Sequence, residues 1–136
     1  MRFNAYNPLA GGMLTNKYKN FEDTPSYGRF TNRPNYQNRY WKPSYFDGIR
    51  IVKEVCEKEG ISIVEATYRW MAFHSMLNET RGDGLIMGFS RFSQLQQNIE
   101  AIKQGGLPET IVSAFSRAWE LCKFDAPEYF TYYKGK

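Results

Sequence analysis

Cysteine, histidine and long apolar runs are all scarce in this sequence of 136 residues. Cys56 and Cys122 lie far apart and His74 is the one histidine, so the sequence contains neither a C-x-x-C pair nor a zinc-binding pattern. We therefore expect two reduced thiols in a cytoplasmic protein. His74 lies in a helical pattern beside Trp70 and Phe73, which indicates a packed or partly exposed helix residue rather than the base of a hydrolase. No segment approaches the roughly 18 apolar residues of a membrane span, and the first residues do not resemble a signal peptide.

Aromatic side chains, in contrast, are abundant. They make up 17% of the chain, and apolar residues make up 42%, which is enough to bury a core and excludes wholesale disorder. The length fits one domain and is about half that of a barrel of eight βα units, which has about 250 residues. The formal net charge of +4 favours anionic ligands weakly. Because the basic residues are scattered, this charge does not identify a nucleic-acid-binding protein.

Hydrophobic spacing predicts two short strands and four helices. The first strand falls within residues 2–6 and ends at the Asn7-Pro8 turn, and the second is the apolar run 85–88. The aromatic stretch 15–43 shows no period, and we interpret it as a loop that packs on another part of the protein. The tail 127–136 shows no period either. The helices are expected from a Ser44/Asp47 cap to Gly60, from a Ser62-x-x-Glu65 capping box onward, from Ser90 or Ser93 to Gly105-Gly106, and after Pro108.

The order of these elements indicates an α/β fold. Strands that are separated by helices favour parallel pairing through crossover connections. Two parallel strands leave both edges open and provide little sheet for four helices to cover. We therefore expect an incomplete fold without a second domain.

Residues 7–17, NPLAGGMLTNK, directly follow the first predicted strand. Their small residues allow close approach of the backbone and can direct N–H groups toward an anion, while Thr15 can donate a hydrogen bond and Lys17 adds charge. A plain turn at the end of a strand explains the segment as well, because a single Gly-Gly pair is a weak signal. Arg29, in Gly28-Arg29-Phe30, is a further candidate contact, although a lone loop arginine is ordinarily just solvated.

Residues 88–98, GFSRFSQLQQN, run from the second predicted strand into a helix. A helix N-terminus carries unpaired N–H groups and partial positive charge, so its first turn, with Ser90, Arg91 and Ser93, suits a phosphate. A capped surface helix explains the same residues. Amides on one face of this helix can bind an adenine edge or a ribose; they belong to Gln94, Gln97 and Asn98.

Several blocks in this sequence together resemble one known family. They are Tyr6 to Gly12, Lys17-Tyr18, Gly28 to Phe30, Asn38 to Trp41, Arg69-Trp70, and Met87 to Asn98. In this order and nearly end to end, they are similar to the C-terminal portion of the aldo-keto reductases, and most of all to the aflatoxin-aldehyde reductase branch.

This resemblance implies part of a (β/α)₈ TIM barrel that reduces aldehydes and ketones with NADPH. Residues 1–136 would supply its last two strands, 7 and 8, with their helices and a C-terminal helix. The catalytic Tyr, Asp, Lys and His of the family lie in earlier strands, so no catalytic residue is assigned here. The implied NADP(H) contacts are Asn7, Pro8, Leu9, Ala10, Gly11, Gly12, Met13, Leu14, Thr15 and Lys17 with Arg29 around the pyrophosphate, and Ser90, Arg91, Gln94, Gln97 and Asn98 around the adenosine, with Arg91 suited to a 2′-phosphate.

Two positions depart from the family pattern. Asn16 stands where relatives tend to have glycine. Thr131 follows Tyr129-Phe130, where relatives of this branch end in an arginine that meets the substrate.

Three classes of function therefore stay open. The resemblance favours a reductase fragment, either a truncated product or an incomplete gene prediction, which binds NADP(H) and accepts a small carbonyl substrate only when the missing strands complete it. A non-catalytic interaction protein could instead pair through open sheet edges. The stretch with Arg29, Arg33 and Arg39 could stack bases, but no RNA-binding motif is present, and we expect neither a nucleic-acid nor a membrane partner.

Overall fold

Two short parallel strands hold the N-terminal segment beside the middle of the chain. In the computed structural model, which describes residues 1–23 and 25–127, Asn4 lies opposite Gly84 and Ala5 opposite Leu85. The predicted parallel pairing is thus confirmed, although both strands are shorter than expected. The elements are β1 (Asn4–Ala5), the 3₁₀ helix η1 (Ala10–Thr15), α1 (Pro34–Tyr40), α2 (Pro43–Glu59), α3 (Ile63–Phe73), the 3₁₀ helix η2 (Glu79–Arg81), β2 (Gly84–Leu85), α4 (Phe92–Lys103) and α5 (Glu109–Cys122).

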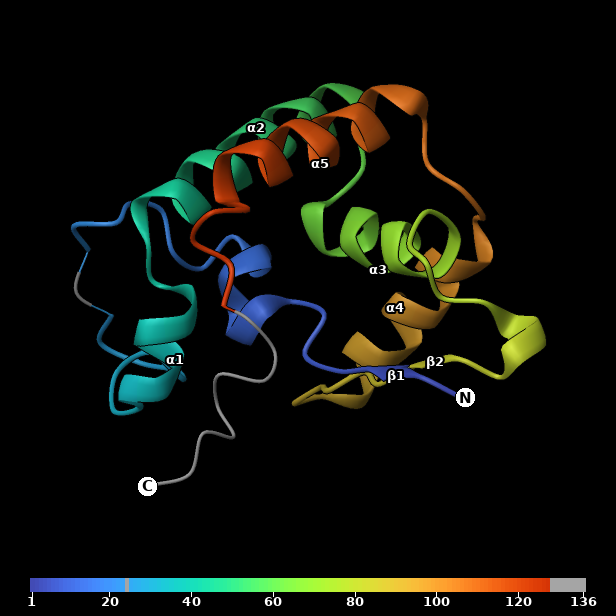
Figure 1. Ribbon diagram of the computed structural model, residues 1–136, viewed down its shortest axis with the longest axis horizontal. Coiled ribbons are helices and arrows are strands. Elements are labelled where there is room, and N and C mark those ends of the chain that lie inside the picture. Colours follow the sequence, from blue (N-terminus) through green and yellow to red (C-terminus); the bar gives the residue numbers. More distant parts are fainter. Residues whose placement is uncertain (24, 128–136) are drawn as a thin grey trace.

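The helices form a layer over one side of this small sheet (Figure 1). The long helices α2 and α5 lie side by side and run in opposite directions, α3 lies beneath them, and α4 packs against α3 close to the strands. The fold is therefore rich in helix, with two strands in the described part of the chain. No helix there is long and apolar enough to cross a membrane.

The core lies where α2, α3 and α5 meet. Val52, Ala66 and Ile111 are each at most 1% exposed, and Cys56 joins the same cluster. Helices α2 and α5 approach closely at Gly48, because a Cβ atom there would lie 2.9 Å from the Cys122 sulfur. Both cysteines are free thiols, and burial raises the pKa of Cys56 to about 11.

The predicted helix ends are confirmed in part. Ser62 caps α3 by accepting a hydrogen bond from the Glu65 N–H at 3.1 Å, and Gly60 ends α2 with φ of 67°. The predicted Ser44 cap is wrong: α2 begins one residue earlier, at Pro43, and the Ser44 hydroxyl donates to Asp125 instead. Pro43 supplies the helical φ of the first turn and needs no capped N–H. Helix α4 begins at Phe92, between the two serines that were its predicted starts.

The interpretation of residues 15–43 as a loop without helix is wrong at α1. This helix of seven residues carries no buried side chain and no apolar stripe, so hydrophobic periodicity could not reveal it. The aromatic residues of the stretch do pack, as expected: Phe30 is fully buried, and its ring centroid lies 5.1 Å from the centroids of both Tyr18 and Trp41. The predicted tail from residue 128 onward, with Thr131, lies outside the described residues.

A buried arginine joins α3 to the connection between α4 and α5. Arg69 donates from Nη1 to Glu65 at 2.8 Å, from Nε to the Gly105 carbonyl at 2.8 Å, and from Nη2 to the Gly106 carbonyl. Its side chain is 9% exposed. One turn further along, the Nε2 atom of His74 accepts a hydrogen bond of 2.8 Å from the Leu107 N–H. The histidine is half-buried at the C-cap of α3, directly after the last helical residue, so the predicted packing is confirmed and its place inside the helix is not.

The side chain of Asp83 holds the strand pair together where β2 begins. Its carboxylate accepts hydrogen bonds from the N–H of Phe3 at 2.9 Å and of Asn78 at 3.0 Å, and Arg81 lies 3.2 Å away. The backbone hydrogen bond from Phe3, followed by that from Asn78, holds the pKa of Asp83 below its usual value, with Arg81 adding to the effect.

We predict that Asp83 makes the protein less stable in acid. Because its pKa is lower in the folded than in the unfolded chain, the contribution is fully present above the unfolded value of about 3.9 and is lost as the pH falls through the folded value. Melting temperatures measured between pH 7 and pH 3 should fall less steeply for Asp83→Asn, which starts lower at pH 7. Asp47→Asn, at an exposed ion pair with Arg50, is the control and should follow the original protein. Equal slopes for Asp83→Asn and the original protein would contradict this role.

Candidate functional site

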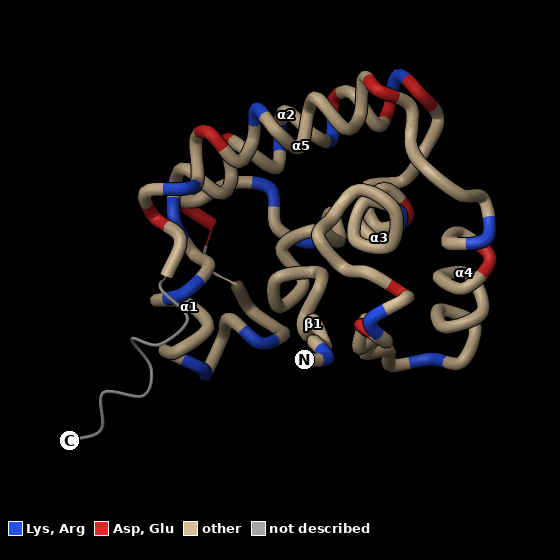
Figure 2. The backbone as a smooth tube through the Cα atoms, turned by 45° about the vertical axis from the view of Figure 1, so that its right-hand side comes forward, with Lys and Arg blue, Asp and Glu red and all other residues tan. Residues whose placement is uncertain are grey.

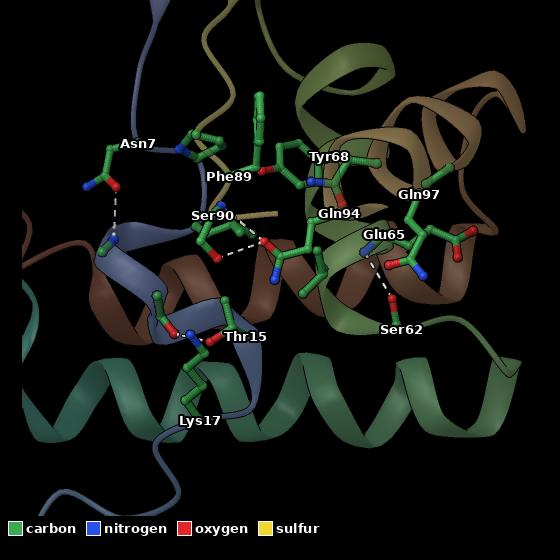
Figure 3. Close-up of a pocket in the computed structure, with 18 of the residues that line it drawn as sticks. Asn7, Thr15, Lys17, Ser62, Glu65, Tyr68, Phe89, Ser90, Gln94 and Gln97 are labelled. Atoms are coloured by element: carbon green, nitrogen blue, oxygen red, sulfur yellow. Dashed lines mark hydrogen bonds between the residues drawn. The ribbon is translucent and has the colours of Figure 1, made fainter. Parts of the chain in front are cut away.

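The two segments singled out in the sequence line one cleft of about 1300 Å³. Residues from 7–17 form one wall and residues from 88–98 the other, although they are far apart in the chain. Arg29 joins the first wall. Figure 3 shows Thr15 and Lys17 on one side of the cleft and Glu65 and Gln97 on the opposite side. The cleft brings together Asn7, Pro8, Leu9, Gly11, Gly12, Thr15, Lys17, Arg29, Ser90, Gln94, Gln97 and Asn98 of the predicted set.

Four predicted residues are not among those that line the cleft. Met13 is 1% exposed and belongs to the interior. Ala10 and Leu14 are half-buried in the turn of η1. Arg91 is exposed and precedes α4 as its N-cap. Within η1, the backbone departs from helical dihedral angles at Gly11, Gly12 and Leu14, so side chains of neighbouring residues do not share one face.

Several backbone N–H groups of segment 7–17 donate hydrogen bonds within the segment itself. Asn7 has φ of 56° and Ala10 of 48°, conformations that non-glycine residues rarely adopt. Asn7 Oδ1 accepts from the Gly11 N–H at 3.0 Å, while the Gly12 N–H donates to the Leu9 carbonyl at 2.8 Å. The expectation that these N–H groups point at an anion is therefore wrong for Gly11 and Gly12, because both donate within the turn.

Helix α1 braces this turn. Gly11 has φ of 72°, and a Cβ atom there would lie 2.8 Å from the Tyr36 ring and 3.2 Å from that of Phe30. The Asn7 amide donates to the Tyr40 hydroxyl at 2.9 Å. Only glycine fits a position with both this backbone conformation and this close approach, so the wall of the cleft is fixed by the aromatic residues of the stretch 15–43.

Side chains, rather than backbone amides, supply the positive end of the cleft. Arg29 lies over the Tyr36 ring at 5.5 Å, and its Nη1 is 3.3 Å from the Tyr36 hydroxyl and 3.5 Å from Asn7 Oδ1. Lys17 is exposed on the same wall. The Thr15 hydroxyl donates to the Gly12 carbonyl at 2.6 Å. Two cations that line the same cleft favour an anionic group there.

Gln94 caps the N-terminus of α4 with its own side chain. Its Oε1 accepts from the Ser90 N–H at 3.1 Å, the Ser90 hydroxyl at 3.0 Å and the Arg91 N–H at 3.3 Å. The sequence analysis predicted these groups at the start of the helix as donors to a ligand, but all three already donate to the Gln94 amide oxygen. Gln97 is exposed, whereas Asn98 is 9% exposed. Of the three predicted amides, Gln94 and Gln97 are both exposed, and the Gln94 oxygen is already hydrogen-bonded.

Sequence reasoning missed the floor of the cleft, which is helix α3. This helix packs against both η1 and α4. The missed lining residues of α3 recur at i, i+1, i+4 and i+5, so they share one face, and two polar side chains among apolar ones are a signal that the sequence does contain. They are Val64, Glu65, Tyr68 and Arg69; Tyr6, Tyr18, Tyr36, Ser62, Ile86, Phe89, Glu100, Ala101 and Gln104 line the cleft as well.

Two of the three arginines of the stretch 15–43 are engaged with tyrosines. Arg39 lies over the Tyr40 ring at 5.7 Å and donates to the Tyr6 hydroxyl at 3.3 Å, and Arg29 lies over Tyr36 in a similar way. Figure 2 shows the basic residues spread over many elements and interleaved with acidic residues along α2 and α5. Among the described residues, no group of three or more His, Cys, Asp or Glu side chains could hold a metal ion.

Comparison with known proteins identifies the family. The profile described as the Aldo/keto reductase family matches residues 1–120. Human "Aldo-keto reductase family 7 member A3" is 43% identical, with 96% of this chain and 42% of the relative covered. Human "Aflatoxin B1 aldehyde reductase member 2" is 41% identical, over 96% of this chain and 39% of the relative. An aldo-keto reductase of the fungus Pseudocercospora fijiensis is 33% identical, over 94% and 45%.

This chain spans about two fifths of the length of the two human relatives. The matched region includes the strand pair and both walls of the cleft, which lie within residues 1–120. The resemblance to the aflatoxin-aldehyde reductase branch is confirmed by the named relatives. The chain belongs to the aldo/keto reductase family.

Proposed function

We propose that this chain is the NADP(H)-binding C-terminal part of an aldo-keto reductase that reduces aldehydes and ketones to alcohols. In this proposal, β1 and β2 correspond to strands 7 and 8 of a (β/α)₈ barrel, and residues 1–136 are one incomplete domain. The supporting observation is that residues 7–17 and 88–98, far apart in the sequence, line a single cleft together with Arg29. Loops after strands 7 and 8 are a common phosphate-binding position in such barrels.

The cleft has the chemistry that an extended dinucleotide needs. Lys17 and Arg29 would hold the diphosphate, with Thr15 beside them. Gly11, packed directly against the Tyr36 and Phe30 rings, would keep this wall in place beneath the ligand. Ser90, Gln94, Gln97 and Asn98 would bind the adenosine, and Arg91 would meet the 2′-phosphate from the edge of the cleft.

The bound nicotinamide would supply a hydride to the carbonyl carbon of the substrate. The residues of this chain would bind and orient the dinucleotide, and Asn7, held by Tyr40, would keep the strand end in position. We assign none of them as the proton donor: Tyr6 follows β1 and feeds the cofactor loop. A small carbonyl substrate would be reduced only when the other strands of the barrel are present.

We predict that purified chain binds NADPH weakly and prefers it to NADH, as measured by titration followed by fluorescence. Arg29→Ala should raise the dissociation constants of both NADPH and NADH by about tenfold. A hydrogen bond to a charged group contributes about 1.5–3 kcal/mol, and 1.4 kcal/mol corresponds to a factor of ten in affinity. Arg91→Ala should weaken NADPH alone, because only NADPH carries the 2′-phosphate.

Arg33→Ala is the matched control, since Arg33 is an exposed arginine of the same stretch and does not line the cleft. It should bind both cofactors like the original chain. An unchanged affinity of the Arg29 variant for both cofactors, or an unchanged preference for NADPH in the Arg91 variant, would refute the charge assignment.

We also predict that the isolated chain does not reduce an aldehyde such as benzaldehyde, because no proton donor is assigned in it. Loss of NADPH absorbance would be followed with and without aldehyde, and a full-length relative serves as the positive control. Steady aldehyde-dependent oxidation of NADPH by the chain alone would show that the catalytic group lies within these residues.

A second candidate function is association through the open sheet. Large apolar side chains are exposed around the strand pair: Phe3 is 58%, Ile86 55% and Phe89 50% exposed, and a sheet of two strands has unpaired edges. Such a protein would form dimers or larger assemblies in gel filtration with light scattering as its concentration rises. A clean monomer at all concentrations would remove this candidate.

A further inference from the structure

One buried hydroxyl in the cleft has no hydrogen-bond partner among the described residues. Tyr68 lies on α3, lines the cleft and is 0% exposed. Its hydroxyl is buried and makes no hydrogen bond to the described part of the chain. Figure 3 shows the side chain extending from α3 toward Phe89, at the start of the 88–98 wall.

A buried hydroxyl without a hydrogen bond is costly. Leaving a donor or acceptor unsatisfied costs about 1–3 kcal/mol, and such groups in native proteins call for an explanation. A phenylalanine would fill the same space without this cost. Other buried polar side chains nearby are satisfied: Thr67 donates to the Ile63 carbonyl at 2.7 Å, and Arg69 makes three hydrogen bonds.

The position of Tyr68 indicates which part of a ligand could reach it. Helix α3 forms the floor between η1, which bears the positive wall, and α4, which bears the amides. A dinucleotide laid across this floor would have its phosphates at Lys17 and its base at Gln97. The stretch over Tyr68 would then be the ribose and phosphate oxygens that join them.

We propose that Tyr68 is a ligand-contacting residue that donates a hydrogen bond to a ribose or phosphate oxygen of the bound nucleotide. This inference depends on the proposed function. Contact requires the half-exposed Phe89 side chain to rotate away from the hydroxyl, which its position in a loop outside helix and strand allows.

The protonation state of Tyr68 suits a donor. Desolvation by burial raises the pKa of Tyr68 above its ordinary value, so the group keeps its proton at neutral pH. A ribose hydroxyl or a phosphate oxygen can accept a hydrogen bond from the Tyr68 hydroxyl, whereas an apolar ligand would leave that hydroxyl without a partner.

Tyr68→Phe tests the contact because stability and binding should change in opposite directions. The variant should melt at the same or a higher temperature without ligand, since an unpaired hydroxyl is removed. Its dissociation constant for NADPH should rise about threefold to tenfold, the factor that corresponds to one neutral hydrogen bond. Both are measured on the full chain, by melting curves and by isothermal calorimetry with NADPH and with 2′,5′-ADP.

Tyr45→Phe is the matched control. Tyr45 lies on α2 away from the cleft, with its hydroxyl 3.5 Å from the Asp125 carbonyl. Removing this hydroxyl should leave the NADPH dissociation constant unchanged.

The outcomes separate the contact from the proposed function. If the original chain binds NADPH and Tyr68→Phe binds it equally well, the contact is wrong and the proposed function stands. If Tyr68→Phe melts at a lower temperature and binds equally well, the hydroxyl has a structural partner and the inference also fails. If the original chain binds neither NADPH nor 2′,5′-ADP, the proposed function fails and the contact with it.

Discussion

The arrangement of the cleft depends on the buried guanidinium of Arg69. It is the group that fixes α3 against the connection leading to α5, through Glu65 and the carbonyls of Gly105 and Gly106. A buried charge that lost these partners would be strongly unfavourable, by about 3–5 kcal/mol for a broken pair. Helix α3 packs against both α4 and η1, so this clamp holds the floor of the cleft to the connection that follows the α4 wall.

The parts of the fold that could be predicted are those whose causes are local. The Ser62 cap and the Gly60 stop depend on residues within one helical turn, and the parallel strand pair follows from the order of elements. Helix α1 could not be predicted, because it is held by rings such as Phe30 from outside its own sequence. The floor of the cleft was missed for a different reason: polar residues do share one face of α3, but only the packing of α3 brings this face beside two distant segments.

The two segments singled out in the sequence do line one cleft, but the hydrogen bonds within them differ from those expected. Small residues at 10–12 do mark a tight turn beside the cleft, but the N–H groups of Gly11 and Gly12 bond within it. The positive charge on this wall comes instead from the side chains of Lys17 and Arg29, and Arg29 lies over the aromatic face of Tyr36. The residue types therefore predicted which segment lines the cleft. Which N–H groups are free to donate depends on hydrogen bonds within the turn, and only a structure reveals these.

The side-chain cap at the start of α4 has a consequence for affinity. The Gln94 oxygen is a competitor tethered within the same molecule, and a tethered group acts as though present at millimolar effective concentration. An incoming oxygen that sought the same three donors would exchange one set of hydrogen bonds for another and gain little net energy. Charge then decides which ligand group can bind at this end of the cleft. A doubly negative phosphate forms stronger hydrogen bonds with these donors than the neutral Gln94 amide does, so a phosphate is the kind of group that can displace the Gln94 oxygen.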